Sequence, residues 1–127
     1  MRRFVLLRHD YPMLHWDLLL EIEPEAPCPT WRLEAIPTFD TIVPAVRLPD
    51  HRAHYLTYEG PVSGDRGFVW RERWGHYQLL YQKSGRLELH LFEAGGESLL
   101  TLAFVSPLTN CWTAHLREVR RPSEVSP

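Results

Sequence analysis

The 127-residue sequence contains little cysteine, carries no net positive charge and has no long apolar run. Its two cysteines, Cys28 and Cys111, lie far apart, and the first residues lack the apolar core and cleavage site of a secretory signal. We therefore expect a cytoplasmic protein with reduced cysteines, because reducing compartments disfavour disulfides. The apolar segment at residues 4–7 is too short to cross a membrane, so no membrane contact is expected.

The formal net charge of −2 argues against a protein that coats nucleic-acid backbones, because such proteins are usually strongly basic. Arginines gather locally at residues 2–8, 66–73 and 117–121, where solvated strand faces and a basic tail account for them. Any contact with nucleic acid should therefore be small, such as the end of a strand.

Long runs with helical spacing are also missing, whereas apolar and aromatic residues are plentiful. The chain is 44% apolar, with five Trp, five Tyr and five Phe, and its eleven prolines are spread over many segments. These features predict an all-β fold, a single compact β-barrel of about eight strands with long loops, over residues 1–119. Residues 120–127 are expected to form a loose tail. The expected strands are residues 4–7, 14–23, 30–36, 42–48, 68–74, 76–82, 86–93, 99–105 and 112–119, with a turn at Gly75.

Residue types that bind metals interrupt the apolar pattern near the start of the chain. In an extended strand, the side chains of His15, Asp17, Leu19 and Glu21 share one face. Neighbouring side chains on one face lie about 6.6 Å apart at the backbone, close enough for both to reach one ion. His9 precedes them on the neighbouring expected strand, so His9, His15 and Asp17 form a candidate metal site.

Two alternatives remain open for this cluster when it is judged from the residues alone. The same residues could be buried polar groups that satisfy one another. Alternatively, His15-x-Asp17 with one more histidine would form the facial triad of non-haem iron oxygenases, although no obvious clamp for a co-substrate carboxylate accompanies it. The candidates for that third ligand are His51, His54, His76, His90 and His115.

A second cluster follows at Asp50, His51 and Tyr55. The rings of His51 and Tyr55, four residues apart, could both donate to a phosphate oxygen, and His51 could titrate near neutrality as a general acid. A surface loop with ordinary aromatic packing is the alternative interpretation.

Together, these segments resemble the 3′-phosphoesterase module of bacterial DNA ligase D, which also occurs as a stand-alone protein. The resemblance covers roughly residues 4–75. The family motif H-D-x-x-x-L-H-[YW]-D-x-x-L-E is matched by His9, Asp10, Leu14, His15, Trp16, Asp17, Leu20 and Glu21. The family motif D-H-x-x-x-Y…[FY]-E-G is matched by Asp50, His51, Tyr55, Tyr58, Glu59 and Gly60.

The resemblance implies a β-barrel that binds Mn²⁺ or another divalent cation and trims 3′ ends in DNA repair, as a phosphodiesterase and phosphomonoesterase. Its substrate would be the 3′ end of DNA or of an RNA–DNA primer-template, and a DNA ligase or polymerase of end joining is a candidate partner. The metal ligands then fall on His9, His15 and Asp17, and the phosphate-contacting catalytic residues on His51 and Tyr55. By physical argument, Asp10 and Glu21 would then be supporting groups that orient imidazoles or strands.

Two departures from the family pattern concern phosphate binding. Leu19 and Val43 stand where the family has arginines, and neither can replace the donor fork of a guanidinium. Arg47 or Arg52 are the candidate substitutes. The alternative is a non-catalytic module that binds a nucleic-acid end or a partner and retains the metal site.

Overall fold

The structure is a computed structural model that describes residues 1–106 and 108–119, and the expected tail at 120–127 lies outside the described residues. The described chain is all-β, as predicted, and forms a closed eight-stranded antiparallel barrel with one additional short strand. A four-residue 3₁₀ helix is its one helical element. The elements are β1 (Arg2–His9), β2 (His15–Leu20), β3 (Cys28–Leu33), β4 (Ile42–His51), η1 (Ala53–Leu56), β5 (Gly60–Pro61), β6 (Phe68–Lys83), β7 (Arg86–Glu93), β8 (Gly96–Phe104) and β9 (Cys111–Glu118).

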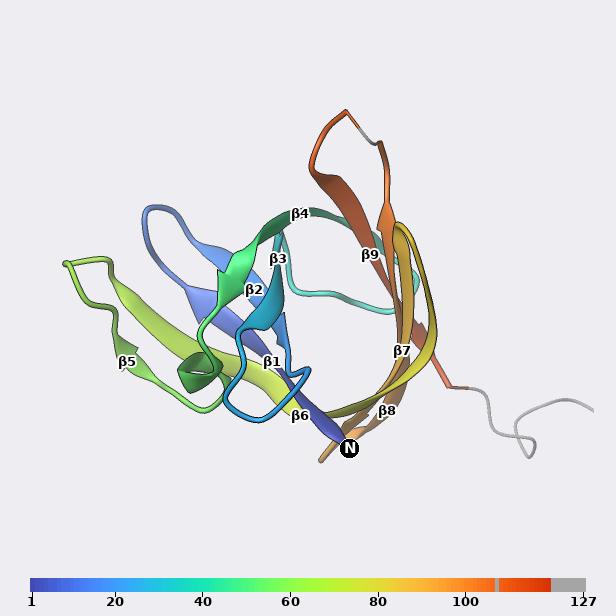
Figure 1. Cartoon of the computed structure of the whole chain (residues 1–127), viewed down its shortest axis with the longest axis horizontal. Coiled ribbons are helices and arrows are strands. Elements are labelled where there is room, and N and C mark those ends of the chain that lie inside the picture. The colour runs from blue at the N-terminus through green and yellow to red at the C-terminus, as the bar shows by residue number, and fades with distance from the viewer. Residues whose placement is uncertain (107, 120–127) are drawn as a thin grey trace, which may run out of the picture.

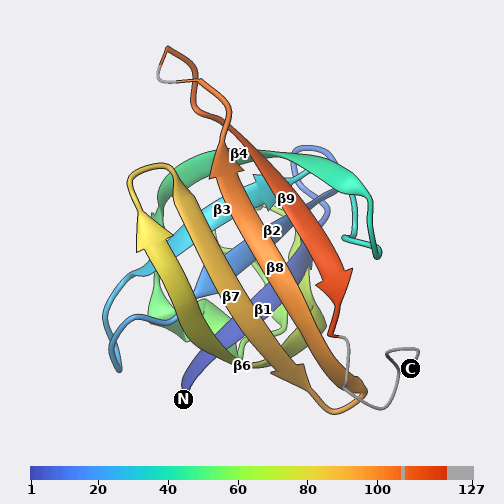
Figure 2. The same ribbon diagram turned by 90° about the vertical axis from the view of Figure 1, so that its right-hand side faces the viewer.

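The barrel closes because β6 is long enough to pair with two strands (Figures 1 and 2). The strand order is β1-β2-β3-β4-β9-β8-β7-β6, and the first half of β6 returns to pair with β1. The second half of β6 pairs with β7. The last pair between these two strands joins Arg2, at the start of β1, to Tyr77 of β6. Residues of β6 after Tyr77 have no partner on β1, so the two strands separate at this end of the barrel.

Apolar side chains fill two separate clusters, one inside the barrel and one outside it. On β1, Phe4 and Leu6 belong to the interior cluster, whereas Val5 and Leu7 belong to the outer one. Residues 4–7 therefore form an unbroken apolar run, because the strand buries both of its faces. Figure 1 shows what covers the outer face: η1 and β5 lie beside the barrel wall, next to β1 and β6.

The expected turn at Gly75 is wrong, because residues 68–83 form the single strand β6. The glycine is instead required by a close approach. A Cβ atom at this position would overlap the carbonyl oxygen of Phe92 and lie 3.0 Å from its carbonyl carbon. Gly75 therefore lets β6 pass against β7 at the point where it changes partners.

The segment between β4 and β6 carries little regular structure. It contains η1, then β5, whose Gly60 and Pro61 pair with the start of β6. Within residues 1–106 and 108–119, no helix has the length and apolar character that crossing a membrane would require.

Candidate metal centre

The candidate metal residues lie at one end of the β1–β2 hairpin, on the outer face of the barrel. His9 pairs directly with His15, and Leu7 pairs with Asp17. Residues opposite each other in an antiparallel pair point to the same side of the sheet. His9, His15 and Asp17 therefore face outward with Leu7, and His15 and Asp17 are 6% and 3% exposed.

Three histidine rings are each held by one backbone carbonyl. His15 Nδ1 lies 2.8 Å from the Met13 oxygen, His9 Nε2 lies 2.8 Å from the Arg66 oxygen, and His51 Nδ1 lies 3.0 Å from the Pro49 oxygen. A carbonyl oxygen can only accept, so each of these ring nitrogens carries the hydrogen. In a neutral ring the other nitrogen then holds a lone pair.

Those three remaining nitrogens converge on one carboxylate oxygen. Asp17 Oδ2 is 3.2 Å from His15 Nε2, 3.8 Å from His51 Nε2 and 3.9 Å from His9 Nδ1. Lone pairs that face a carboxylate repel it unless a proton or a cation lies between them. The hydrogen bond to Asp17 accordingly raises the pKa of His15, although burial opposes the shift.

These residues fit a divalent cation. Candidate ligand atoms of His9, His15 and Asp17 all lie within 4.8 Å of one another. The second oxygen of the carboxylate, Asp17 Oδ1, is buried and has no hydrogen-bond partner among the described residues. Imidazole nitrogens with a carboxylate oxygen form a donor set suited to first-row transition metals, and carbonyl-anchored rings are the usual support for such ligands.

Asp10 supports this cluster from behind. Its Oδ1 accepts a hydrogen bond of 2.8 Å from the backbone amide of Phe68. This contact fixes the backbone two residues after Arg66, and the Arg66 carbonyl in turn accepts the hydrogen bond from His9. Gly67 has φ +75° and no room for a Cβ, which would overlap Asp10 Oδ1. Asp10 is thus connected to the His9 imidazole through the backbone of residues 66–68.

Beside the cluster lies a cavity of about 120 Å³. A water molecule needs about 10–15 Å³ of such a volume, so the cavity has room for several water-sized groups, such as an ion and the oxygens of a phosphate. His51 and Tyr55, the two expected phosphate contacts, both line it, although His51 comes from β4 and Tyr55 from η1. The cavity is lined by Leu7, His9, Asp17, His51, Tyr55, Val62, Arg66 and Val69.

Two arginines near the cluster were not expected from the sequence. Arg66 lines the cavity, and its Nε and Nη2 donate to Ser63, at 2.6 Å to the carbonyl oxygen and 3.2 Å to the hydroxyl. Arg32 pairs with Asp17 across β2 and β3, so its side chain shares the face of the cluster. Its charge acts to lower the pKa of His15. The sequence signal for Arg66 is a single arginine between Gly64 and Gly67, and it indicates a turn more readily than a site.

The expected substitutes for the family arginines lie elsewhere. Arg47 lies over the Trp31 ring, 4.8 Å from its centroid, and its Nη2 is 2.9 Å from Asp50. Arg52 lines a different depression. Leu19 is fully buried in the outer apolar cluster and Val43 is buried inside the barrel.

Of the five other histidines, only His51 comes near Asp17. His54 packs against Tyr58, with ring centroids 4.5 Å apart, and His76 is exposed. His90 stacks on Phe92 at 4.1 Å. His115 lies 3.8 Å from Asp40, remote from the cluster.

Glu21 contacts neither the cluster nor its histidines. It shares the face predicted for it, but it lies four residues beyond Asp17, roughly 13 Å along an extended chain. There it accepts hydrogen bonds from the Arg3 amide at 3.0 Å and from the Arg3 guanidinium at 3.1 and 2.6 Å. Glu21 therefore links β1 to the end of β2 and does not orient an imidazole.

This contact predicts a pH-dependent contribution to stability. Hydrogen bonds from Arg3 lower the pKa of Glu21 below its usual 4.5, so the stabilisation is complete above that value and is lost as the pH falls through the lower folded pKa. Because Arg3 is 43% exposed, Glu21→Gln should cost only about 1 kcal/mol at pH 7. Urea unfolding of both proteins from pH 7 to pH 3 measures the gap, which should close below pH 4.5. Glu23→Gln, on an exposed residue, is the control, and an equal loss in both variants would refute the assignment.

Comparisons with known proteins add no family to this description. No protein-family model matches the chain, and a search of curated proteins finds no match either. The function must therefore be inferred from the side chains of the site.

Proposed function

We propose that this chain is a Mn²⁺-dependent phosphoesterase, or one using another divalent cation, that processes the 3′ ends of nucleic acids in DNA repair. One observation carries the proposal: three anchored histidine rings direct their free nitrogens at the buried Asp17 carboxylate, beside a cavity that Arg66 lines. A cation site next to a guanidinium is suited to a phosphate group.

His9, His15 and Asp17 would hold the ion, which would offset the negative charge that develops on a phosphoryl oxygen. Water would attack the phosphorus while the P–O bond to the leaving oxygen breaks, and His51 would supply the proton that this oxygen takes up. Because its Nδ1 already donates to Pro49, a second proton on Nε2 makes an imidazolium that can donate to the leaving oxygen. Asp17 Oδ2, 3.8 Å away, stabilises that charged ring. Tyr55 lines the same cavity, and its hydroxyl would donate to another phosphate oxygen.

Arg66 and Arg32 would supply the positive charge that Leu19 and Val43 cannot. Arg66 lines the cavity, and its guanidinium would bind a phosphate oxygen there. Arg32 is the cross-strand partner of Asp17 and adds charge at the same face. The small cavity and the net charge of −2 favour contact with a strand end over a long duplex. A ligase or polymerase that uses the trimmed end would be the partner in end joining.

A non-catalytic module is the second candidate, and Leu19 and Val43 favour it. Both family arginine positions are filled by side chains that pack in apolar clusters. Such a protein would bind the ion and a nucleic-acid end without turnover.

The test is Mn²⁺-dependent removal of phosphate from a primer-template that carries a 3′-phosphate. We expect turnover by the wild-type protein and a loss of about tenfold to a hundredfold in kcat/KM for Arg66→Gln, because a charged hydrogen bond to phosphate is lost. The main-chain carbonyl that anchors His9 is retained in this variant, so Mn²⁺ affinity should not change.

Arg52→Gln is the matched control, because Arg52 is exposed outside the cavity. It should leave kcat/KM within about twofold of the wild type. Equal losses of kcat/KM in the two variants would show that Arg66 does not bind the substrate phosphate. Tight Mn²⁺ binding with no turnover of a 3′-phosphate or a 3′-terminal ribonucleotide would refute the phosphoesterase and support the non-catalytic binding module.

A further inference from the structure

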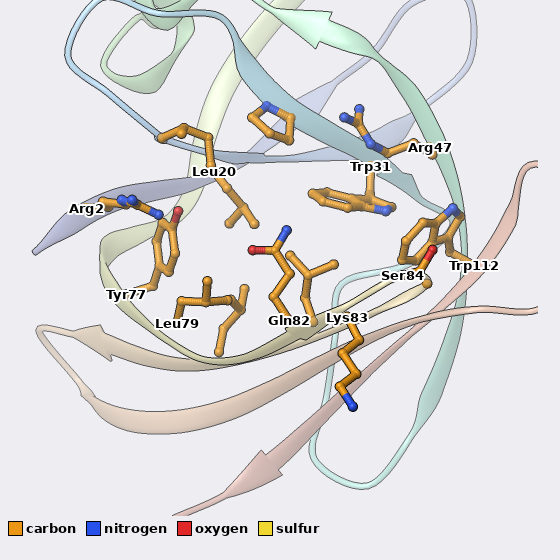
Figure 3. A pocket seen from close by; sticks show the side chains of 15 residues that line it. Arg2, Leu20, Trp31, Arg47, Tyr77, Leu79, Gln82, Lys83, Ser84 and Trp112 are labelled. Carbon is orange, nitrogen blue, oxygen red and sulfur yellow. The ribbon is translucent and has the colours of Figure 1, made fainter.

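A second and larger cavity lies at the other end of the β1–β2 hairpin. Its volume is about 490 Å³, and it opens where β6 separates from β1, at the mouth of the barrel (Figure 3). Arg2, Leu20 and Ile22 line it, whereas the metal cluster uses His9 and His15 at the opposite end of the same strands. Cavities of 300–1,000 Å³ are typical of small-molecule sites, and barrel mouths are a frequent place for them.

Aromatic and aliphatic side chains form most of its wall. Trp31 is 3% exposed, and its ring meets Trp112 edge to face at a centroid distance of 5.6 Å. Tyr77 forms the opposite side in Figure 3, and its hydroxyl donates to the Glu21 carbonyl at 2.7 Å. Flat, fixed rings of this kind favour a ligand with a flat apolar body.

The polar groups of the cavity are cationic or neutral. The described lining residues include Arg2, Arg47 and Lys83 but no carboxylate. Arg47 is paired with Asp50, and the Lys83 ammonium points away from the cavity in Figure 3. Arg2 lies beside Tyr77, with which it shares a side-chain hydrogen bond, and it belongs to no ion pair within residues 1–106 and 108–119. The amide of Gln82 points into the middle of the space.

We propose that this cavity binds a small organic anion with a flat aromatic body. The body would lie against Trp31 and Trp112, and the anionic group would face Arg2. The Gln82 amide can hydrogen-bond the same group. The site shares no residue with the metal centre, so it stands whether or not the chain is a phosphoesterase.

The experiment compares two fluorescent probes with the same aromatic framework. One is 1-anilinonaphthalene-8-sulfonate, which is anionic, and the other is N-phenyl-1-naphthylamine, which is neutral. Titration of the folded wild-type protein with each probe should give saturable binding at one site, about tenfold tighter for the sulfonate. Non-saturable binding, or the absence of binding, overturns the proposal.

Location in the cavity is tested by filling it. Gln82→Trp places an indole in the space and should weaken sulfonate binding by about tenfold or more. Gln78→Trp is the matched control, because Gln78 lies on the same exposed stretch of β6 but does not line the cavity. Equal binding by both variants, with both shown to be folded by circular dichroism, places the probe elsewhere and refutes the site.

The choice of an anion is tested at Arg2. Arg2→Gln should weaken the sulfonate about tenfold and leave the neutral probe unchanged, whereas Arg86→Gln, at an exposed residue outside the cavity, should change neither. Equal effects of Arg2→Gln on the two probes would show that the cavity is only an apolar one.

Discussion

Asp17→Asn should reduce the affinity for Mn²⁺ by at least about a hundredfold, which corresponds to roughly 2.7 kcal/mol. The reason is the position of this carboxylate. Asp17 Oδ2 is the point at which nitrogens of His9, His15 and His51 converge, and Oδ1 is buried with no partner among the described residues. An amide of the same shape removes the charge and replaces one oxygen by a donor, which cannot bind a cation.

Calorimetric titration with Mn²⁺ measures this effect, and Asp40→Asn is the matched control. Asp40 is an exposed carboxylate that lies near His115, remote from the cluster, so its amide should bind Mn²⁺ like the wild type. Thermal unfolding without metal separates a ligand from a structural ion pair. A metal ligand predicts that Mn²⁺ raises the Tm of the wild type and not that of Asp17→Asn. If the metal-free variant instead melts well below the wild type, and Mn²⁺ shifts neither protein, Asp17 is a structural partner of the histidines.

The proximity of His9, His15 and Asp17 could be predicted because it is almost entirely local. His15 and Asp17 are two residues apart on one strand, and His9 lies across the turn that joins this strand to the preceding one. His51 comes from a distant strand, and only the resemblance of its motif to a known family placed it near the others. Its approach to Asp17 through Nε2 depends on the hydrogen bond to Pro49, which no sequence pattern indicates.

The positions of Arg66 and Arg32 near the cluster could not be predicted, because they depend on contacts between segments that are distant in the sequence. Arg66 reaches the cavity because the loop between β5 and β6 folds back over the outer face of the barrel, where the Arg66 carbonyl accepts a hydrogen bond from His9. Arg32 reaches the cluster through the register between β2 and β3. Alternation along a strand predicts on which face of the sheet a side chain lies but not which partner it contacts there. Glu21 is an example. It lies on the expected face, yet its carboxylate is held by Arg3.

The barrel itself was predicted from the sequence, but the way in which the single strand β6 closes it, by pairing with both β1 and β7, was not. An isolated glycine in an extended segment is typical both of a turn and of a close approach between backbones. At Gly75 the turn was expected, and the structure shows the close approach. The distinction depends on β7, which lies later in the chain and touches Gly75 only in the folded barrel.

Gly75→Ala should therefore be among the most destabilising single substitutions in this chain. The added Cβ would overlap the Phe92 carbonyl oxygen and lie 3.0 Å from its carbon and 3.3 Å from Glu93 Cα. All three are backbone atoms, so no side-chain rotation can relieve the overlap. The backbone of β7 must instead move away from β6, the strand that closes the barrel. Overpacking of this kind costs about 1–3 kcal/mol and occasionally more, and the upper end corresponds to roughly 10 °C in Tm for a domain of this size.

Gly95→Ala is the control that isolates this cause. Gly95 lies in the turn before β8, has no positive φ, and has no atom within 4 Å of an added Cβ. Its substitution should change the free energy of unfolding by no more than about 0.5 kcal/mol. Urea unfolding of the two variants gives the comparison. Equal stabilities would contradict the close approach between Gly75 and β7. They would mean that the β7 backbone lies farther from Gly75 than in this structure. Because β1 also carries His9, a loosened closure should weaken Mn²⁺ binding in Gly75→Ala and leave it intact in Gly95→Ala.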